Sequence, residues 1–376
     1  VIGYENRGAS PDELQRMLSL LEQEMHSGAW GLSSGLIYPP GVFASQDELA
    51  QLAGVVRKFD GIYTSHMRSE GDQLIEALQE ALRIGRQAGV PVQISHLKTL
   101  GKKNWHKLSA VFETLERARD RGVAVTADRY PYTASSTELD AILPPWAVQG
   151  GAEAELERLR RPELRDKIFS GILMPEKELA DDILISKVFS QKNKHLEGKL
   201  LGQAAEIRKQ KIHDALLELL IEEELQVDAI FFSMSEDNLK QILKKDYCMI
   251  GSDASVRDVT GPLSDGKPHP RGFGTFPRVI WKYAAGENIL TLASAIRKMT
   301  GQPAEKMGLR NRGLLKKGHK ADIVIFSLSD IHDRATYENP HQYPAGIQRV
   351  MVNGKWVLIK GALTGEYPGK LLLKTG

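Results

Sequence analysis

The sequence has very little cysteine, no long apolar run and almost no net charge. Cys248 is the only cysteine among 376 residues, which excludes an internal disulfide and suits a reducing compartment, so we expect a cytoplasmic protein. No apolar run approaches the roughly 20 residues needed to cross a bilayer. The formal net charge of +2 gives no electrostatic reason to expect nucleic acid or a membrane as a partner.

The first residues also lack two familiar marks of a complete or secreted chain. Residue 1 is Val1 rather than Met, and no signal-like segment follows it. We therefore expect a processed form or a piece of a longer protein. The composition, 41% hydrophobic and 26% charged, is that of a globular protein with a large core.

The sequence does contain one β-α unit written nearly three times. Three apolar runs each lead to a polar side chain: 61–65 to His66, 90–95 to His96, and 123–127 to Asp128. Two segments with helical periodicity, 71–88 and 105–121, separate the runs. Right-handed crossovers imply parallel strands, and parallel α/β barrels keep their active sites at the carboxyl ends of the strands. The pattern predicts an α/β barrel with chemistry at one end.

The repeating pattern breaks after Tyr132 and resumes later. Residues 135–225 are charge-rich and mostly helical in pattern, and they far exceed an ordinary βα loop of about 2–6 residues. We expect a lid over the active-site face; the alternative is a solvated helical decoration. Val227–Met234 and Cys248–Asp253 predict further barrel strands, and 269–276 predicts a loop rich in Gly and Pro.

The tail has a different character from the rest of the chain. Residues 313–376 are β-rich and contain a hairpin with Asn353–Gly354 at its turn. We therefore assign residues 1–312 to the barrel, with 135–225 as its lid insertion, and 313–376 to a separate small β part.

Side chains at the predicted strand ends are the candidates for chemistry. A lone His66 would more often be a hydrogen-bonded structural residue, but His66 and His96 at equivalent places in successive units favour a site for zinc or a similar metal as much as that structural interpretation. Asp253 ends another strand, where a carboxylate binds metal, accepts a proton from a metal-activated water, or caps a turn. Spacing leaves these readings open. Cys248, deeper in that strand, reads as a small buried residue.

Three cations lie close to the same strand ends. Lys98, Arg129 and Arg271 are suited to holding a substrate carboxylate, and the alternative for each is a surface charge or an internal ion pair. Tyr132 and Ser136 offer further hydrogen bonds, although Ser in a loop is usually only loop chemistry.

Short motifs spread over nearly the whole chain, outside 135–225, share one family pattern. They are Gly31–Leu36, Tyr38–Gly41, Ser65–Arg68, Gln93–Lys98, Thr126–Asp128, Tyr130–Ser136, Gly251–Asp253, His269–Arg271, Gly274–Arg278, Gly313–Leu315, Ala321–Val324, Asp333–Thr336 and Val352–Gly354. Together they resemble the N-acyl-D-amino-acid deacylases (D-aminoacylases) of the amidohydrolase superfamily. The set is specific to the family, though not to one substrate within it.

The resemblance implies a (β/α)8 TIM-type metal-dependent hydrolase barrel with a helical lid and a small C-terminal β-sandwich part. It implies that His66 and His96 bind a zinc ion (Zn2+). It also implies that Asp253 is the catalytic carboxylate and faces a second, weaker metal position.

The same resemblance implies the reaction and the substrate contacts. The amide bond of an N-acyl-D-amino acid would be hydrolysed to a carboxylate and a free D-amino acid by metal-activated water, with Asp253 as general base and then acid. Lys98, Tyr132 and Arg271 match residues that hold the α-carboxylate, and Ser136 matches a further substrate contact. Another amidohydrolase, such as a cyclic amidase or a D-residue dipeptidase, is the alternative enzyme.

One part of the family pattern is absent. The family begins with a strand carrying His-x-His and has a cysteine zinc ligand soon after, whereas this chain has no His-x-His and Cys248 stands in a different motif. Val1 aligns well inside the family pattern, so we expect a barrel incomplete at its N-terminus, completed by a missing N-terminal segment or a partner chain. Alone, the chain would bind zinc weakly and turn over little substrate. A catalytically silent subunit or fragment is the third reading.

Overall fold

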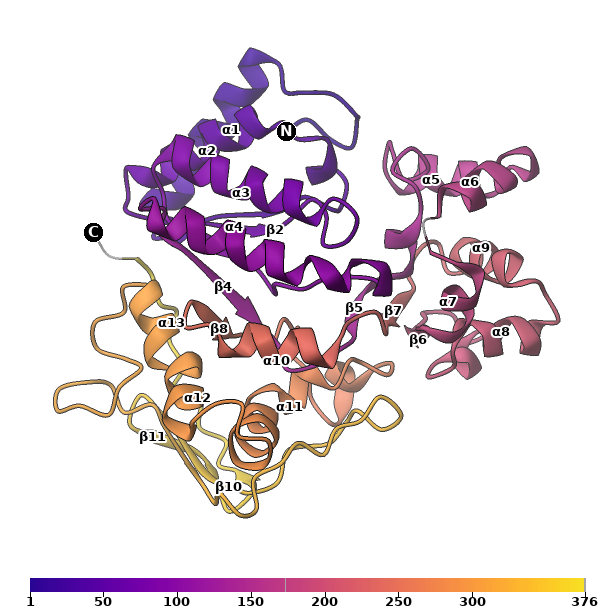
Figure 1. Ribbon diagram of the computed structural model, residues 1–376. Coiled ribbons are helices and arrows are strands. Elements are labelled where there is room, and N and C mark those ends of the chain that lie inside the picture. The colour runs from indigo at the N-terminus through magenta and orange to yellow at the C-terminus, as the bar shows by residue number, and fades with distance from the viewer. Residues whose placement is uncertain (173, 375–376) are drawn as a thin grey trace.

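The computed structural model describes residues 1–172 and 174–374. Its strands form three sheets: one of five parallel strands, one of three antiparallel strands and one of four antiparallel strands. Figure 1 shows the first helices stacked above the parallel sheet, the middle of the chain projecting to the right, and the last strands below.

The parallel sheet contains the three predicted β-α units side by side. Its order is β1 (Gly31–Gly35), β2 (Ile62–His66), β3 (Val92–Ile94), β4 (Val125–Arg129) and β8 (Cys248–Ile250). In register, Tyr63 lies beside Val92, and Val92 lies beside Val125. Because the strands are parallel, His66 and the segments after β3, β4 and β8 meet at one edge, as the sequence predicts.

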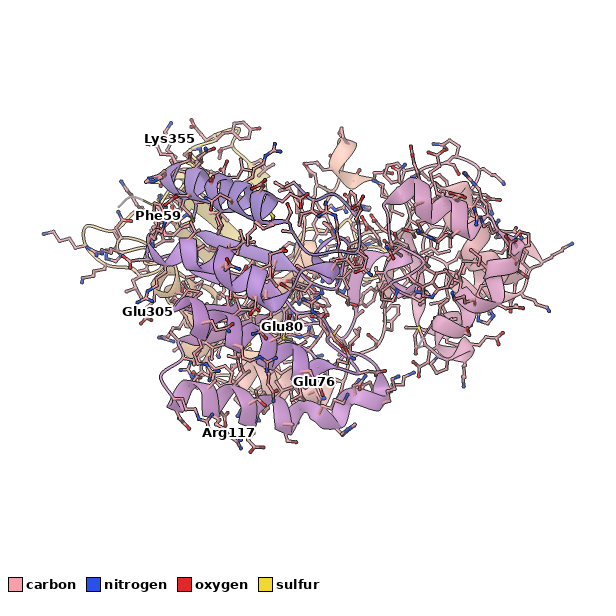
Figure 2. All side chains as sticks on the ribbon, turned by 90° about the horizontal axis from the view of Figure 1, so that it is seen from above. Phe59, Glu76, Glu80, Arg117, Glu305 and Lys355 are labelled. Carbon is pink, nitrogen blue, oxygen red and sulfur yellow. The ribbon has the colours of Figure 1, made fainter. Side chains whose placement is uncertain are left out.

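Four helices cover the outer face of this sheet. They are α1 (Pro11–His26), α2 (Gln46–Arg57), α3 (Leu74–Ala88) and α4 (Leu108–Asp120). The hydroxyls of Ser10 and Ser45 cap α1 and α2 by accepting hydrogen bonds from backbone amides in the first turn. Figure 2 shows the helices as one layer, with Glu76 of α3 and Arg117 of α4 among its labelled residues.

The two faces of the parallel sheet differ in chemistry. Tyr63, Val92 and Val125 are buried with the apolar side chains of α1 to α4 in one hydrophobic core. Since side chains alternate along a strand, the neighbours of these residues point to the opposite face. That inner face carries polar groups, including Gln93 and Asp128.

The long insertion after β4 has its own sheet and its own core. Its three-stranded sheet has the order β5 (Ser135–Glu138), β7 (Asp228–Phe231), β6 (Ile183–Lys187), and its helices are α5 (Ala152–Leu159), α6 (Arg165–Gly171), α7 (Glu176–Asp181), α8 (Leu201–Arg208) and α9 (Ile212–Glu222).

The prediction that Val227–Met234 continues the barrel is wrong. β7 pairs antiparallel with both β5 and β6, and β4 pairs directly with β8. An apolar run of this length fits any buried strand, so local pattern did not identify its sheet.

The segments before and after β8 in the sequence are helical. Their helices are α10 (Glu236–Lys244) before the strand and α11 (Arg271–Arg278), a π-helix (Val279–Gly286), α12 (Leu292–Met299) and α13 (Gly301–Lys306) after it. The predicted loop at 269–276 is wrong for most of its length, because α11 begins at Arg271. Gly274 is needed there for close packing: a Cβ atom would overlap the Tyr132 hydroxyl and lie 2.7 Å from the Cβ of Asp333.

The tail forms the four-stranded antiparallel sheet. Its order is β12 (Ala362–Leu363), β11 (Lys355–Ile359), β10 (Ile347–Val352) and β9 (Ile323–Phe326). The predicted hairpin is confirmed: β10 and β11 are joined by Asn353 and Gly354, whose φ angles are +47° and +83°, as a tight hairpin turn requires.

The parallel sheet is open at both sides. Over residues 1–172 and 174–374, β1 pairs only with β2, and β8 pairs only with β4. In the same residues, no helix combines the length and the apolar character needed to cross a membrane.

Candidate metal and substrate site

Two histidines and one glutamate meet at the carboxyl end of the parallel sheet. His66 is the last residue of β2, Glu70 follows four residues later, and His96 follows β3. One ligand atom from each lies within 4.8 Å of the others, and no other such trio of His, Cys, Asp or Glu occurs in the described part of the chain. The sequence predicted that the two histidines lie together, and the structure agrees; it did not predict Glu70.

This trio fits a metal ion such as zinc. The buried Nε2 of His66 has no hydrogen-bond partner among the described residues, and it lies 3.8 Å from Oε2 of Glu70. Burial lowers the pKa of His66 to about 4, so its imidazole is neutral near pH 7 and keeps a free lone pair. Two imidazoles and a carboxylate are common zinc ligands.

Lys98 is part of the same buried cluster. Its Nζ lies 2.5 Å from Oε1 of Glu70 and 2.6 Å from Nδ1 of His96, and its side chain is only 3% exposed. Burial by itself would raise the pKa of Glu70. The charge of Lys98, followed by those of the two histidines, outweighs this effect, so the pKa of Glu70 lies well below its usual value. In this structure Lys98 therefore forms the internal ion pair that the sequence left as the alternative to a contact with a substrate carboxylate.

Asp253 and Arg271 form a second pair at this end of the sheet. Asp253 follows β8 with a φ of +51°, and its Oδ2 lies 2.7 Å from Nη1 of Arg271, the first residue of α11. Asp253 is not a member of the ligand trio. The Asp253 side chain is 37% exposed, so its carboxylate is accessible to a bound molecule.

Ser136 lies beside Arg271 at a cavity of about 450 Å³. Nη2 of Arg271 donates to the backbone oxygen of Ser136 at 3.4 Å. The cavity is lined by both residues together with Tyr38, Thr137, Glu138, Asp228, Ser255 and Arg257. Tyr38 also packs edge-on against His66, with ring centroids 5.1 Å apart, so the cavity wall and the ligand trio share a side chain.

The hydroxyl of Tyr132 is bound by the C-terminal part of the chain, and the guanidinium of Arg278 lies over its ring, 4.7 Å from the centroid. Its hydroxyl donates to Oδ2 of Asp333 at 3.3 Å, and burial followed by the charge of Asp333 raises its pKa far above the usual value. The guanidinium of Arg278 also binds Asp333, at 2.9 Å. Tyr132 therefore connects the barrel to the C-terminal part of the chain.

Tyr130 is the tyrosine that lies among the cations. The guanidinium carbons of Arg129 and Arg271 lie 4.3 Å and 4.7 Å from its ring centroid, and Nζ of Lys98 lies 5.9 Å from it. Its buried hydroxyl has no partner among the described residues. Arg129 is itself buried, and among the described residues it donates only to the backbone oxygen of Tyr132 and to the sulfur of Met234.

His269 connects the start of α11 to the segment that precedes β5. Nδ1 accepts the backbone N–H of Arg271 and Nε2–H donates to the carbonyl of Ala134, both at 3.0 Å. These partners assign the tautomer, because a carbonyl only accepts and an amide N–H only donates. Burial, and then the charge of Arg271, lowers the pKa of His269 well below its usual value, so it is neutral.

Two of the missed residues left a signal in the sequence. Glu70 lies in the strand-end segment that already carries His66, and a carboxylate beside a candidate ligand is itself a candidate. Tyr130 stands in the same motif as Tyr132, but only the fold decides which of the two rings faces the cations.

Comparisons with known proteins show which family the chain resembles. Residues 192–358 match an amidohydrolase family, Amidohydro_3. The chain is 35% identical over 371 residues to a D-aminoacylase from Alcaligenes xylosoxydans xylosoxydans, a match that covers 98% of this chain and 66% of the relative. The chain thus spans just under two thirds of that relative.

Solved structures give the same answer. A crystal structure of D-aminoacylase, described as defining a novel subset of amidohydrolases, superposes with a TM-score of 0.79 at 34% identity, covering 97% of this chain and 67% of that one. An N-acyl-D-glutamate deacylase from Bordetella bronchiseptica, complexed with zinc and a phosphonate inhibitor, gives 0.77 at 31% identity, covering 94% and 67%. Because the identity exceeds 30% over nearly the whole chain and the folds superpose, the chain belongs to the D-aminoacylase family of amidohydrolases.

Proposed function

We propose that the chain forms the metal and substrate site of an enzyme that hydrolyses N-acyl-D-amino acids. The observation that carries this proposal is the buried trio His66, Glu70 and His96 beside the Asp253–Arg271 pair, in a chain of this family. The substrate class comes from the relatives, one of which is named for N-acyl-D-glutamate and was solved with zinc.

The roles of the residues follow from their positions. His66 and His96 hold the metal, and Glu70 either completes the ligand set or orients His96. A zinc ion held by these residues would supply Lewis-acid chemistry: polarisation of an amide carbonyl and a lower pKa for a bound water molecule. Asp253 accepts a proton and delivers it to the leaving amine as general base and then acid.

The carboxylate of the substrate needs a cationic and hydrogen-bonding partner near the cavity. Arg271 lines the cavity and presents a planar guanidinium that suits a carboxylate. Tyr130, with its free hydroxyl under Arg271, fits this role better than Tyr132, whose hydroxyl is engaged by Asp333. Lys98 contributes once it moves from Glu70, and Ser136 contacts the acyl side. Closure of the insertion over the cavity would exclude water.

Hydrolysis of N-acetyl-D-amino acids tests the proposal. The zinc-loaded chain, co-expressed with the N-terminal third of the Alcaligenes D-aminoacylase, should release free D-amino acid and leave the L-enantiomers intact, and a chelator should abolish the reaction. Asp253→Asn should lose the activity while binding zinc nearly as well as the wild type. Hydrolysis of cyclic amides or D-dipeptides in preference to N-acyl-D-amino acids would contradict the substrate class.

The open sheet supports a second inference about how the site is completed. Strands β1 and β8 each lack a neighbour on one side over the described residues, and unpaired strand edges favour association. We infer that further strands, from another segment or a partner chain, pair with both edges of the sheet. We also propose that the protein acts in the cytoplasm, where Cys248 stays reduced.

Co-expression tests this second inference. Adding the N-terminal third of the Alcaligenes D-aminoacylase should raise bound zinc and turnover over the chain alone. Full zinc content and normal turnover by the 376-residue chain alone would overturn it. Zinc binding without any turnover in the complemented protein would favour a catalytically silent subunit.

A further inference from the structure

The backbone at His96 adopts a conformation that residues other than glycine rarely take. Its φ angle is +38°, in the left-handed region, although the residue is buried and carries a full imidazole ring. Such conformations persist only where the surroundings hold them, and they concentrate at functional sites. Something near His96 must therefore hold this turn.

Asp128 provides that restraint from the neighbouring strand. Its Oδ1 accepts the backbone N–H of His96 at 2.8 Å, and its backbone oxygen accepts the N–H of Leu97 at 2.9 Å. The turn after β3 is thus hydrogen-bonded at two consecutive amides to one residue of β4. Both bonds restrain the backbone on either side of the His96 side chain in the observed left-handed conformation.

The carboxylate of Asp128 is itself held by neighbouring side chains of β3 and β4. Nε2 of Gln93 donates to Oδ2 of Asp128 at 2.6 Å, and the hydroxyl of Thr126 donates to Oε1 of Gln93 at 2.5 Å. Both oxygens of Asp128 therefore accept N–H donors, and neither belongs to the trio that can hold a metal. This chain of bonds crosses the inner face of the sheet from β4 to β3 and back to β4.

We propose that Asp128 is a positioning residue for the metal centre, which aims the imidazole of His96 by holding its strained backbone turn. This proposal rests on the proposed function, since it assumes that His96 binds a metal. The required property of Asp128 is an oxygen acceptor at the Oδ1 position, not a negative charge and not a bond to the metal.

Cobalt(II) binding to the full chain tests the proposal, because the visible spectrum of Co(II) reports the arrangement of its ligands. Asp128→Ala should weaken Co(II) binding by about 10- to 100-fold, the usual range for residues behind metal ligands, and should alter the spectrum. Asp128→Asn keeps an oxygen acceptor for the N–H of His96, and its amide nitrogen can donate to Oε1 of Gln93 once the Gln93 amide turns over and Nε2 donates to the Thr126 hydroxyl. This variant should bind Co(II) within a few-fold of the wild type with the same spectrum. Loss of binding in Asp128→Asn would show that the carboxylate itself is required and would overturn the proposal.

Thr126→Val is the matched control. It removes the far end of the same bonded chain without touching His96, so it should cost some stability but leave Co(II) affinity and spectrum unchanged. Equal loss of Co(II) binding in Thr126→Val and Asp128→Ala would reduce Asp128 to a structural role and overturn the proposal.

A second readout does not depend on metal. With ¹⁵N-labelled histidine, the backbone amide of His96 is one of ten histidine signals and is assigned with His96→Gln. In Asp128→Ala this amide should shift and exchange faster with solvent, whereas Asp128→Asn should protect it. If neither the wild-type chain nor the chain co-expressed with the N-terminal third of the Alcaligenes D-aminoacylase binds Co(II), the proposed metal centre fails. An amide signal that is unchanged in Asp128→Ala overturns the role of Asp128 by itself.

Discussion

Replacing Glu70 by Gln should destabilise the protein strongly through Lys98. The two side chains are 5% and 3% exposed and their charged atoms lie 2.5 Å apart, so each is almost fully removed from water. Removing one partner of a buried ion pair leaves the other charge unpaired and costs about 3–5 kcal/mol. Gln has nearly the same shape as Glu, so little of this loss comes from packing.

A double-mutant cycle isolates the charge effect. Lys98→Met should cost a similar amount to Glu70→Gln, because it leaves the carboxylate buried with only the two histidines. The double variant removes both charges and should cost less than the sum of the single variants. Glu76→Gln is the control: Glu76 lies on the exposed face of α3, and its replacement should not measurably change stability.

Urea unfolding with a chelator present measures these differences, followed by the fluorescence of the five tryptophans. The pKa of Glu70 is lowered in the folded state, so its contribution is complete above its usual pKa of 4.5 and is lost as pH falls toward the lower folded value. The gap between wild type and Glu70→Gln should therefore stay constant from neutral pH down to about pH 5 and narrow below it. Additive single variants, or a Glu70→Gln protein as stable as the Glu76→Gln control, would refute the ion-pair reasoning.

Three further changes can be checked by the same unfolding measurement. Gly274→Ala should cost about 1–3 kcal/mol, because its Cβ would overlap the Tyr132 hydroxyl; an unchanged midpoint would contradict this packing. Asp333→Asn should cost about 2 kcal/mol by weakening the bond from Arg278, and a loss equal to that of an exposed Asp would argue against it. The pKa of His66 falls from 6.5 to about 4 on folding, so chelated protein should lose roughly 3 kcal/mol as pH drops across that window, and His66→Gln should remove most of that slope.

The β-α repeats were predictable because their information is local. Each apolar run, its polar end and the next helical segment follow one another in sequence, so the convergence of His66 and His96 followed from the rule for parallel strands. The Asn353–Gly354 hairpin was predictable for the same reason, since the two residues that need positive φ are adjacent.

The features that were missed depend on partners distant in sequence. Val227–Met234 is apolar enough for either sheet, and only pairing with β5 and β6 decides which one it joins. A cation near a strand end looks the same whether it awaits a substrate or pairs internally. Lys98 and Arg271 therefore needed the positions of Glu70 and Asp253 before their contacts were known.

The arrangement of the insertion has a consequence for how the chain folds. The chain leaves the parallel sheet after Arg129 and returns to it at Cys248, so pairing β4 with β8 in an unfolded chain requires closing a very long loop, which is entropically costly and slow. However, β5 and β7 pair with each other near the two ends of that loop, and the insertion has its own core. Once the insertion has folded, the open part of the loop shrinks to two short connections. Early folding of the insertion should therefore speed the assembly of the sheet that carries the site.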